Sequence, residues 1–302
     1  MSTPLPALSL AAVPGRRATI LELASEIERR GFTGIYCPSL GDCMALCEAL
    51  AFATSEIKFG TSIAPIYSRH ALDYTQTAAF IHEVSGGRFS FGVGISHGPT
   101  HDRLGIRPGK PLADTRAFVE AFRGAERVGE KPPIVLAALR QRMIRLAAEI
   151  ADGMVFANGA RSHMATSLAE LPAAVRDDDD FYIGNMIPTC IADDVAAAMA
   201  VNRRTLSHYA LLPNYRNYWK EAGYVEEMEA VEALVGAGEP ERITECLSDR
   251  WLADTTLFGS VAKVRDGLEA WYDAGIKTPI LVPSSAAGNQ LTAFQEIFAA
   301  FS

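Results

Sequence analysis

Long uninterrupted apolar runs are missing from this 302-residue sequence, although 49% of its residues are hydrophobic. Charged residues or glycines break every run before it reaches the roughly 18 residues that a membrane-spanning helix needs. The polar start from Met1 to Pro4 also lacks the basic flank of a signal peptide. We therefore expect a soluble, cytoplasmic protein with no membrane partner.

Cysteine and positive charge are also scarce. The five cysteines are an odd number, which favours free buried thiols over a disulfide framework. Cys37, Cys43 and Cys47 form no C-x-x-C pair and have no histidine nearby, so we predict no metal site. The net charge of -8 opposes a phosphate backbone, and no cluster of Lys and Arg offsets it, so nucleic acid is not an expected partner.

What the sequence does contain is a regular alternation of short apolar strands and amphipathic helices. Eight strands are predicted, at residues 7–13, 32–37, 57–63, 88–94, 133–137, 153–157, 181–191 and 277–282. Apolar strands separated by helices imply parallel pairing with helices on the outside. The count of eight predicts an α/β fold, a (β/α)8 TIM barrel that forms a single domain over residues 1–302. An open, doubly wound sheet is the alternative.

An extra segment, at about residues 213–250, lies between the seventh and eighth predicted strands. Its glutamates predict an insertion with a solvated face. Its aromatic residues Tyr215, Tyr218 and Trp219 suggest that it covers either the substrate pocket or a subunit interface.

The segment from Gly92 to Gly98 follows the fourth strand and holds two motifs. It reads G-x-G-x-x-x-G, one residue longer than a dinucleotide fingerprint. It also contains G-x-S-x-G around Ser96, the pattern of a hydrolase nucleophile, which requires a strand that turns straight into a helix. Pro99, Gly105 and the residues after them predict a loop up to about residue 113. The sequence therefore favours neither motif.

Two kinds of side chain remain as candidates for chemistry at the carboxyl ends of the strands. His97 follows the fourth strand, where it is either a proton donor or a polar loop residue. Arg140 and Arg142 begin the fifth helix and Arg161 the sixth. Arginines at helix amino ends favour an anion such as phosphate, although solvated arginines are the alternative.

Together these motifs resemble the bacterial luciferase-like superfamily, and within it the oxidoreductases that use the deazaflavin coenzyme F420. The resemblance runs in family order over most of the chain. The blocks that carry it are GFTGIY at 31–36, IKFGTSIAP at 57–65, Arg69-His70, SGGRFSFGVG at 85–94, LAALRQRM at 136–143 and ADGMV at 151–155.

The resemblance implies a barrel that holds a deazaflavin or flavin at the carboxyl ends of its strands, with a non-prolyl cis peptide behind the ring. The residues it predicts to bind the cofactor are Ser62, Ile63, Gly94, Ser96, His97, Gly98, Ala138, Leu139, Arg142, Asn158 and Gly159. Family members carry acidic residues after the second and fourth strands that this chain lacks. We therefore predict His97 as the general acid or base, with Ser39, Asp42 and Tyr67 as substrate contacts.

The implied activity is hydride transfer between coenzyme F420 and a small organic substrate. An FMN-dependent luciferase-like monooxygenase and a non-catalytic flavin-binding barrel are the alternatives. The resemblance also suggests a homodimer.

Overall fold

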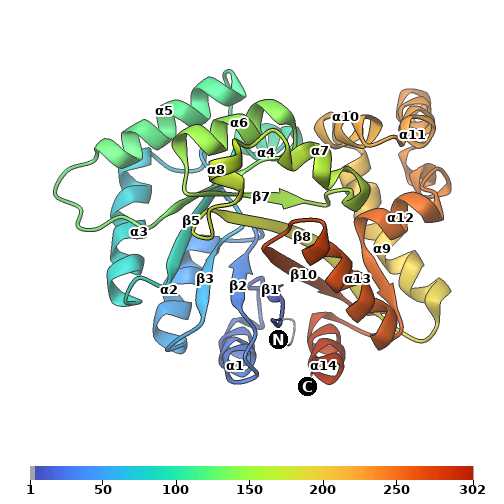
Figure 1. Cartoon of the computed structure of the whole chain (residues 1–302), viewed down its shortest axis with the longest axis horizontal. Helices are drawn as coiled ribbons and strands as arrows, with labels where there is room; N and C mark the ends of the chain where they lie inside the picture. The colour runs from blue at the N-terminus through green and yellow to red at the C-terminus, as the bar shows by residue number, and fades with distance from the viewer. Residues whose placement is uncertain (1–3, 302) are drawn as a thin grey trace. The chain divides into compact units, whose positions relative to one another are not determined.

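A computed structural model describes residues 4–301 as alternating strands and helices (Figure 1). The described chain forms two compact units. The first lies within Met1–Phe156 and Ala169–Gly184, and the second within Ala157–Leu168 and Asn185–Ser302.

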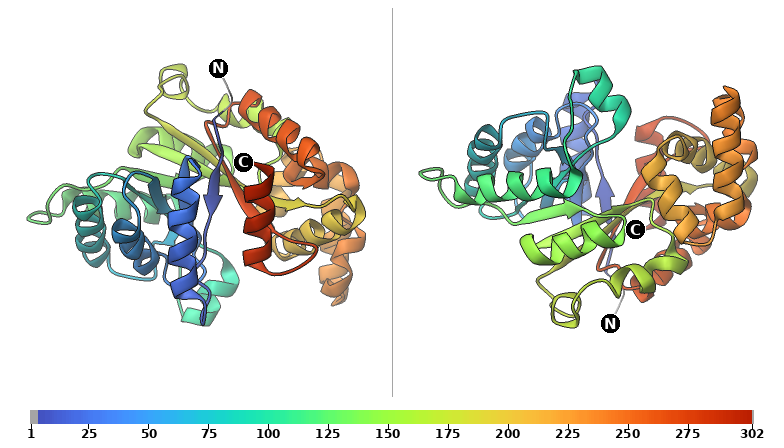
Figure 2. Two further views of the ribbon diagram at one scale, coloured as in Figure 1. Left: turned by 90° about the horizontal axis from the view of Figure 1, so that it is seen from below. Right: turned by 90° about the horizontal axis from the view of Figure 1, so that it is seen from above.

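The first unit is built on parallel strands that pair in the order β1-β2-β3-β5-β6-β7, with β4 beside β5. Their bounds are β1 Ala7–Ser9, β2 Gly34–Cys37, β3 Lys58–Thr61, β4 Ala64–Pro65, β5 Phe89–Gly94, β6 Ile134–Ala137 and β7 Gly153–Ala157. The helices are α1 Arg17–Arg29, α2 Cys43–Ala53, α3 Ala71–Val84, α4 Gly98–Leu104, α5 Pro111–Gly124, α6 Gln141–Ile150 and α8 Ala173–Arg176. Helices α1, α2 and α3 lie next to one another outside these strands (Figure 2).

The second unit holds most of β8 Tyr182–Ile191, which pairs with both β9 Leu257–Gly259 and β10 Thr278–Ser284. Its helices are η1 Arg161–His163, α7 Met164–Leu168, α9 Val195–Ala210, α10 Pro213–Glu221, α11 Val225–Ala237, η2 Pro240–Glu245, α12 Asp249–Thr255, α13 Val261–Asp273 and α14 Gln290–Ala300. Among the described residues, no helix is both long and apolar enough to cross a membrane.

Glycines bring β3 and β5 unusually close together. A Cβ added at Gly92 would lie 1.9 Å from the carbonyl oxygen of Thr61, and one at Gly60 would lie 2.5 Å from the carbonyl oxygen of Ser90. The Thr61 hydroxyl donates to the Gly92 carbonyl at 2.6 Å. Only glycine permits such an approach, so these two positions fix how closely β3 lies against β5.

All eight predicted strands are present, and their order along the chain is confirmed. The short strands β4 and β9 were not predicted. The five cysteines are free thiols, four of them buried and Cys246 half-buried.

The loop predicted between the fourth strand and residue 113 is wrong, since α4 begins at Gly98, directly after His97. Pro99 stands in its first turn, where a fixed φ and a missing N–H favour a helix start. Gly105 ends the helix in the left-handed conformation at φ 64°. Pro and Gly therefore mark the two ends of a short helix here, and the strand-to-helix turn that G-x-S-x-G requires is present.

The predicted insertion forms α10, α11 and η2. Its aromatic residues belong to the core of the second unit, since Tyr215 is 5% exposed and Tyr218 and Trp219 are 0% exposed. Trp219 packs edge-on against Trp251, with ring centroids 4.8 Å apart. These rings are therefore packed within their own unit.

Candidate functional site

Apolar residues meet where β3, β5 and β6 end. The Ser62–Ile63 peptide bond is cis, as the resemblance implied. A Cβ added at Gly94 would lie 2.8 Å from the Ala137 Cβ and 3.1 Å from the Ile63 Cδ1. Glycine at this position therefore lets the half-buried Ile63 and Ala137 lie side by side, and we call Ile63, Gly94 and Ala137 the apolar floor.

The turn after β5 contains His97, three residues after Gly94 of the apolar floor. Ser96 adopts a left-handed backbone with φ 61°, which is uncommon for a residue other than glycine. His97 is half-buried at the N-cap of α4. Burial lowers the pKa of His97 below its ordinary value, and the neighbouring His101 lowers it further. His97 is therefore held mainly in its neutral form near pH 7 and is able to accept a proton.

The beginning of α6 is suited to an anion. Its N-cap residue, Arg140, makes no side-chain capping hydrogen bond, and the first turn contains no acidic residue. Arg142 is exposed in the same turn. The helix dipole and the nearby arginines both favour negative charge. Only three residues separate Ala137 of the apolar floor from Gln141, where this helix begins.

The three predicted substrate contacts differ in the contacts that their side chains make within the protein. Asp42 caps α2 by accepting from the N–H groups of Met44 and Ala45, and it also accepts from Arg69 at 2.6 Å. Ser39 is exposed. The roles assigned to both residues stay predictions.

Tyr67, the third predicted contact, is half-buried. Its hydroxyl donates to Asp114 Oδ2 at 2.6 Å, and its ring meets the His101 ring edge to face, with centroids 5.4 Å apart. The hydroxyl is thus already engaged within the protein. No sequence pattern pointed to Asp114, because a carboxylate in the first turn of a helix ordinarily only interacts favourably with the helix dipole.

Asn158 and Gly159 lie in the second unit, in a turn whose backbone groups are already bonded. The Asn158 N–H donates to the Met186 carbonyl at 3.0 Å, and the Gly159 N–H donates to Asn185 Oδ1 at 3.3 Å. Trp219 Nε1 donates to the Asn158 carbonyl at 3.1 Å. Sequence patterns did not reveal that the insertion supports this turn, because its aromatic residues show no spacing that points to residue 158.

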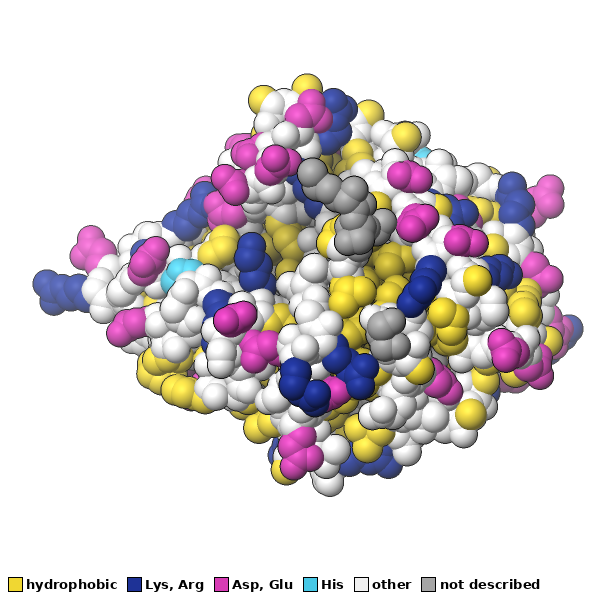
Figure 3. Space-filling view, turned by 60° about the horizontal axis from the view of Figure 1, so that its bottom comes forward, with side chains coloured by type: hydrophobic (Ala, Val, Ile, Leu, Met, Phe, Trp, Pro, Cys, Tyr) yellow, Lys and Arg dark blue, Asp and Glu magenta, His cyan; other side chains and the backbone are white. Residues whose placement is uncertain are grey.

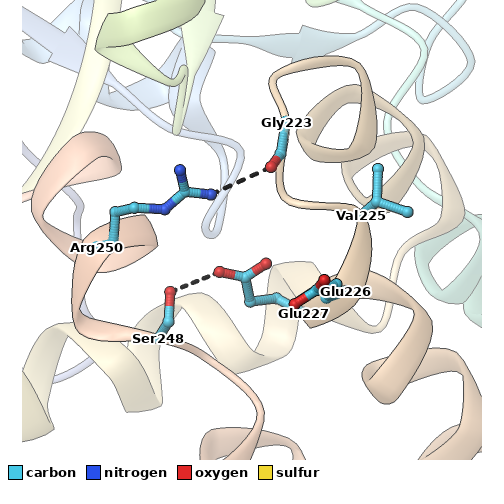
Figure 4. Close-up of a pocket in the computed structure, with 6 residues that line it drawn as sticks. All are labelled: Gly223, Val225, Glu226, Glu227, Ser248 and Arg250. Atoms are coloured by element: carbon cyan, nitrogen blue, oxygen red, sulfur yellow. Dashed lines mark hydrogen bonds between the residues drawn. The ribbon is translucent and has the colours of Figure 1, made fainter.

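Two surface pockets lie elsewhere. One is lined by Gly223, Val225, Glu226, Glu227, Ser248 and Arg250 (Figure 4). Its polar groups bond to one another, Ser248 to Glu227 at 2.7 Å and Arg250 to the Gly223 carbonyl at 3.2 Å. The other is lined by Phe122, Arg123, Lys131, Pro132, Pro133, Ile134, Asp152 and Asp180. Neither contains a residue predicted to bind the cofactor or substrate.

Charge and metal ligands add no further site. Acidic and basic side chains are interspersed over the face shown in Figure 3. Within residues 4–301, no group of three or more His, Cys, Asp and Glu is placed to hold a metal ion.

Solved structures similar to this chain define the fold. A coenzyme F420-dependent tetrahydromethanopterin reductase from Methanopyrus kandleri has a TM-score of 0.77 at 17% identity, over 97% of both chains. The FMN-bound oxygenating constituent of 3,6-diketocamphane monooxygenase from Pseudomonas putida has a TM-score of 0.66 at 14% identity, over 98% of both chains. The fold is a (β/α)8 TIM barrel, as predicted.

Sequence comparison then identifies the family. The model of the luciferase-like monooxygenase family matches residues 6–278. The protein belongs to this family, which confirms the resemblance to the luciferase-like superfamily. A Mycobacterium tuberculosis protein assigned as a coenzyme F420-dependent oxidoreductase, Rv3520c, is 25% identical to it over 315 aligned residues, which cover 88% of this chain and 90% of the relative.

Proposed function

We propose that this protein is an oxidoreductase that transfers a hydride between coenzyme F420 and a small organic substrate. The observation that carries the proposal is the joining of the apolar floor to an anion-accepting helix end through residues 137–141. A flat ring needs the first feature and a phosphate-bearing tail needs the second. The nearly full-length similarity to a protein assigned as F420-dependent supports the choice of coenzyme.

The residues present fit a deazaflavin. Glycine at position 94 leaves no Cβ between Ile63 and Ala137, so no side chain at this position would obstruct a ring lying on the floor. Nothing lies within 4 Å of where a Cβ of Gly98 would be, so the start of α4 is open beside the turn. Exposed arginines 140 and 142 supply the charge that a polyanionic tail requires.

The bound coenzyme supplies the hydride chemistry. The protein's own contribution is to hold ring and substrate in a reactive geometry and to move one proton. Because the pKa of His97 is lowered by burial and by His101, its neutral imidazole is present at pH 7. It is thus suited to accept a proton from a substrate hydroxyl, or to return one in the reverse direction.

A titration of the purified protein tests this proposal. Coenzyme F420 and FMN would each be titrated at two salt concentrations, and the bound species would be identified from its absorption spectrum. We expect tight, salt-sensitive binding of F420. Preference for FMN would instead favour a monooxygenase, a candidate supported by the fold shared with the FMN-bound structure, and binding of neither would contradict both.

Variants that remove positive charge from the start of α6 make the titration a more specific test. Replacing Arg140 and Arg142 together with glutamine is expected to weaken F420 binding by roughly 10- to 100-fold and to flatten its salt dependence. Arg145→Gln is the matched control, because it removes a positive charge from the same helix beyond its first turn, where Arg145 contacts Glu170 at 2.6 Å. Equal losses in the double variant and the control would contradict the assignment of the helix end to the coenzyme's phosphate.

We also propose that the protein is a homodimer with a small-molecule substrate and without a nucleic-acid partner. Light scattering on the purified protein tests the dimer, and a mass of about 33 kDa, the 32.6 kDa of one chain, would contradict it.

A further inference from the structure

Two buried histidines donate to backbone carbonyls at opposite ends of β5. His82, 8% exposed, approaches the Phe89 carbonyl oxygen through Nδ1 at 3.2 Å. His101, 7% exposed, approaches the Ile95 carbonyl oxygen through Nε2 at 2.6 Å. A carbonyl oxygen only accepts, so each of these ring nitrogens carries the proton. Phe89 begins β5, and Ile95 is the first residue after it.

The His101 ring is held from the far side by a second set of contacts. Tyr67 packs edge to face against it at 5.4 Å and 85°, and the Tyr67 hydroxyl donates to Asp114 Oδ2 at 2.6 Å. The same Oδ2 accepts from the Gly109 N–H at 2.8 Å. A Cβ at Gly109 would lie 2.7 Å from Asp114 Oδ1, so a larger residue there would displace the Asp114 carboxylate. Asp114, Tyr67 and His101 therefore form a continuous support, which we call the His101 support.

The His101 support contacts the carbonyl oxygen of Ile95, the residue before the left-handed Ser96. The φ of Ser96, 61°, is disfavoured for a residue with a side chain. Such a conformation persists only where the surroundings enforce it. The His101 main chain also takes part, since its N–H donates to the His97 carbonyl at 3.1 Å. One residue thus holds the turn through both its ring and its backbone.

We propose that His101 is a positioning residue that fixes the Ile95–Ser96–His97 turn and so sets where the His97 imidazole stands. This rests on the proposed function, which makes His97 the group that moves the proton. His101 itself touches neither substrate nor coenzyme in this proposal. Its role is to keep a half-buried imidazole in one orientation.

Three variants test the proposal. His101→Phe keeps an aromatic ring but removes the donor, whereas His101→Gln restores an N–H close to the position of Nε2. His82→Phe is the matched control, because His82 is equally buried and donates to a carbonyl of the same strand at its other end. Two measurements are made on each: hydrogen exchange of the segment at residues 95–104, which needs no coenzyme, and kcat together with the Kd for F420.

We expect His101→Phe to lower kcat roughly 10-fold, with the Kd for F420 changed less than about 2-fold, because a displaced catalytic group affects the chemical step more than binding. Exchange at residues 95–97 should be about 10-fold faster in this variant, which reports local opening. His101→Gln should recover most of kcat and most of the protection of this turn from exchange. His82→Phe should leave kcat and the exchange of this turn unchanged.

The proposal is overturned if His101→Phe leaves exchange and kcat as they are, or if His82→Phe lowers kcat as much, since the cause would then be general destabilisation. If the unaltered protein binds neither F420 nor FMN, the proposed function fails, and the catalytic role of His101 fails with it. The exchange measurement would still show separately whether His101 holds the turn.

Discussion

The two ends of β5 are built in opposite ways. At its amino end, Arg88 donates five hydrogen bonds, to the carbonyls of Ser85, Ile57, Ala51 and Thr54 and to the Thr54 hydroxyl. Its guanidinium also lies over the Phe59 ring at 5.2 Å. At the carboxyl end, a left-handed Ser96 and a half-buried His97 stand beside the open start of α4.

A carboxylate completes the amino end. Glu28 accepts from the N–H groups of Ser55, Glu56 and Ile57 at 2.7–3.1 Å. Burial acts to raise the pKa of Glu28, but these backbone bonds and the charge of Arg88 outweigh it, so the pKa is lowered. Polar groups here are used to hold chain segments together.

The difference matches the division of labour in parallel barrels, where the amino ends of the strands contribute stability and the carboxyl ends contribute function. Hydrogen bonds at the amino end are made within the protein. At the carboxyl end, backbone conformation and imidazole protonation are held away from their ordinary preferences. Variants at the two ends should therefore affect different measured quantities.

The largest expected effect is on stability, from Arg88→Met. Removing the guanidinium leaves several buried carbonyls without a donor, so the free energy of unfolding should fall by about 3 kcal/mol, measured by urea unfolding. Arg116→Met is the control, since Arg116 makes an exposed ion pair with Glu149 and should change stability little. A large loss of kcat in the folded fraction of Arg88→Met would contradict the separation of the two ends.

His97→Gln should lower turnover and leave stability nearly unchanged, which is the reverse of Arg88→Met. Because we propose that His97 moves the proton, its loss is expected to lower kcat roughly 100-fold, while the free energy of unfolding and the Kd for F420 change little. Steady-state kinetics and a coenzyme titration measure this. Parallel losses of turnover and affinity would mean that His97 binds the coenzyme and does not move the proton.

Gly94→Ala tests the apolar floor. The added methyl would lie 2.8 Å from the Ala137 Cβ, so unfolding free energy should fall by about 1–2 kcal/mol, and F420 binding should weaken as the floor is displaced. Gly124→Ala serves as control, because nothing lies within 4 Å of its added Cβ. Unaltered coenzyme binding in Gly94→Ala would rule out the floor as the ring's resting place.

The smallest effect is a pair of pH dependences. Burial and His101 lower the pKa of folded His97 from 6.5, so the unfolded chain takes up the proton first, and stability should fall as pH drops below about 6.5. Glu28, with a pKa lowered from 4.5 mainly by backbone bonds that outweigh burial, should lose its contribution as pH falls below about 4.5. His97→Gln should flatten only the upper window and Glu28→Gln only the lower one. Unfolding free energies measured at several pH values provide the test.

The sequence predicted the strands well, because each has an apolar core several residues long. It failed at α4, where glycine and proline were taken as signs of a loop although they stand at the two ends of a helix. It also missed β4 and β9. The insertion was expected to be a cover, yet its aromatic residues are core, because the sequence does not show which face of a helix is buried.

For the candidate site, the family resemblance indicated Ser62, Ile63 and Gly94. His97 was indicated by its position after the fourth strand, and Arg140 and Arg142 by their position at the start of a helix. The sequence did not indicate that Tyr67 bonds to Asp114 across 47 positions of sequence. Nor did it show that the backbone N–H groups of Asn158 and Gly159 are already bonded. These facts depend on long-range contacts, which local patterns do not record.

The sequence by itself determined the order of strands and helices and the resemblance to the family, because strand alternation and the glycine-rich blocks are local and occur in a fixed order. Only the tertiary structure decided that the sheet closes into a barrel and how the Ile95–Ser96–His97 turn is supported. A carbonyl held by His101, braced by Tyr67 and Asp114, exists only once α4, α5 and the end of β5 are packed together. Hydrogen-bond geometry depends on distances in space, and spacing along the chain does not determine those distances.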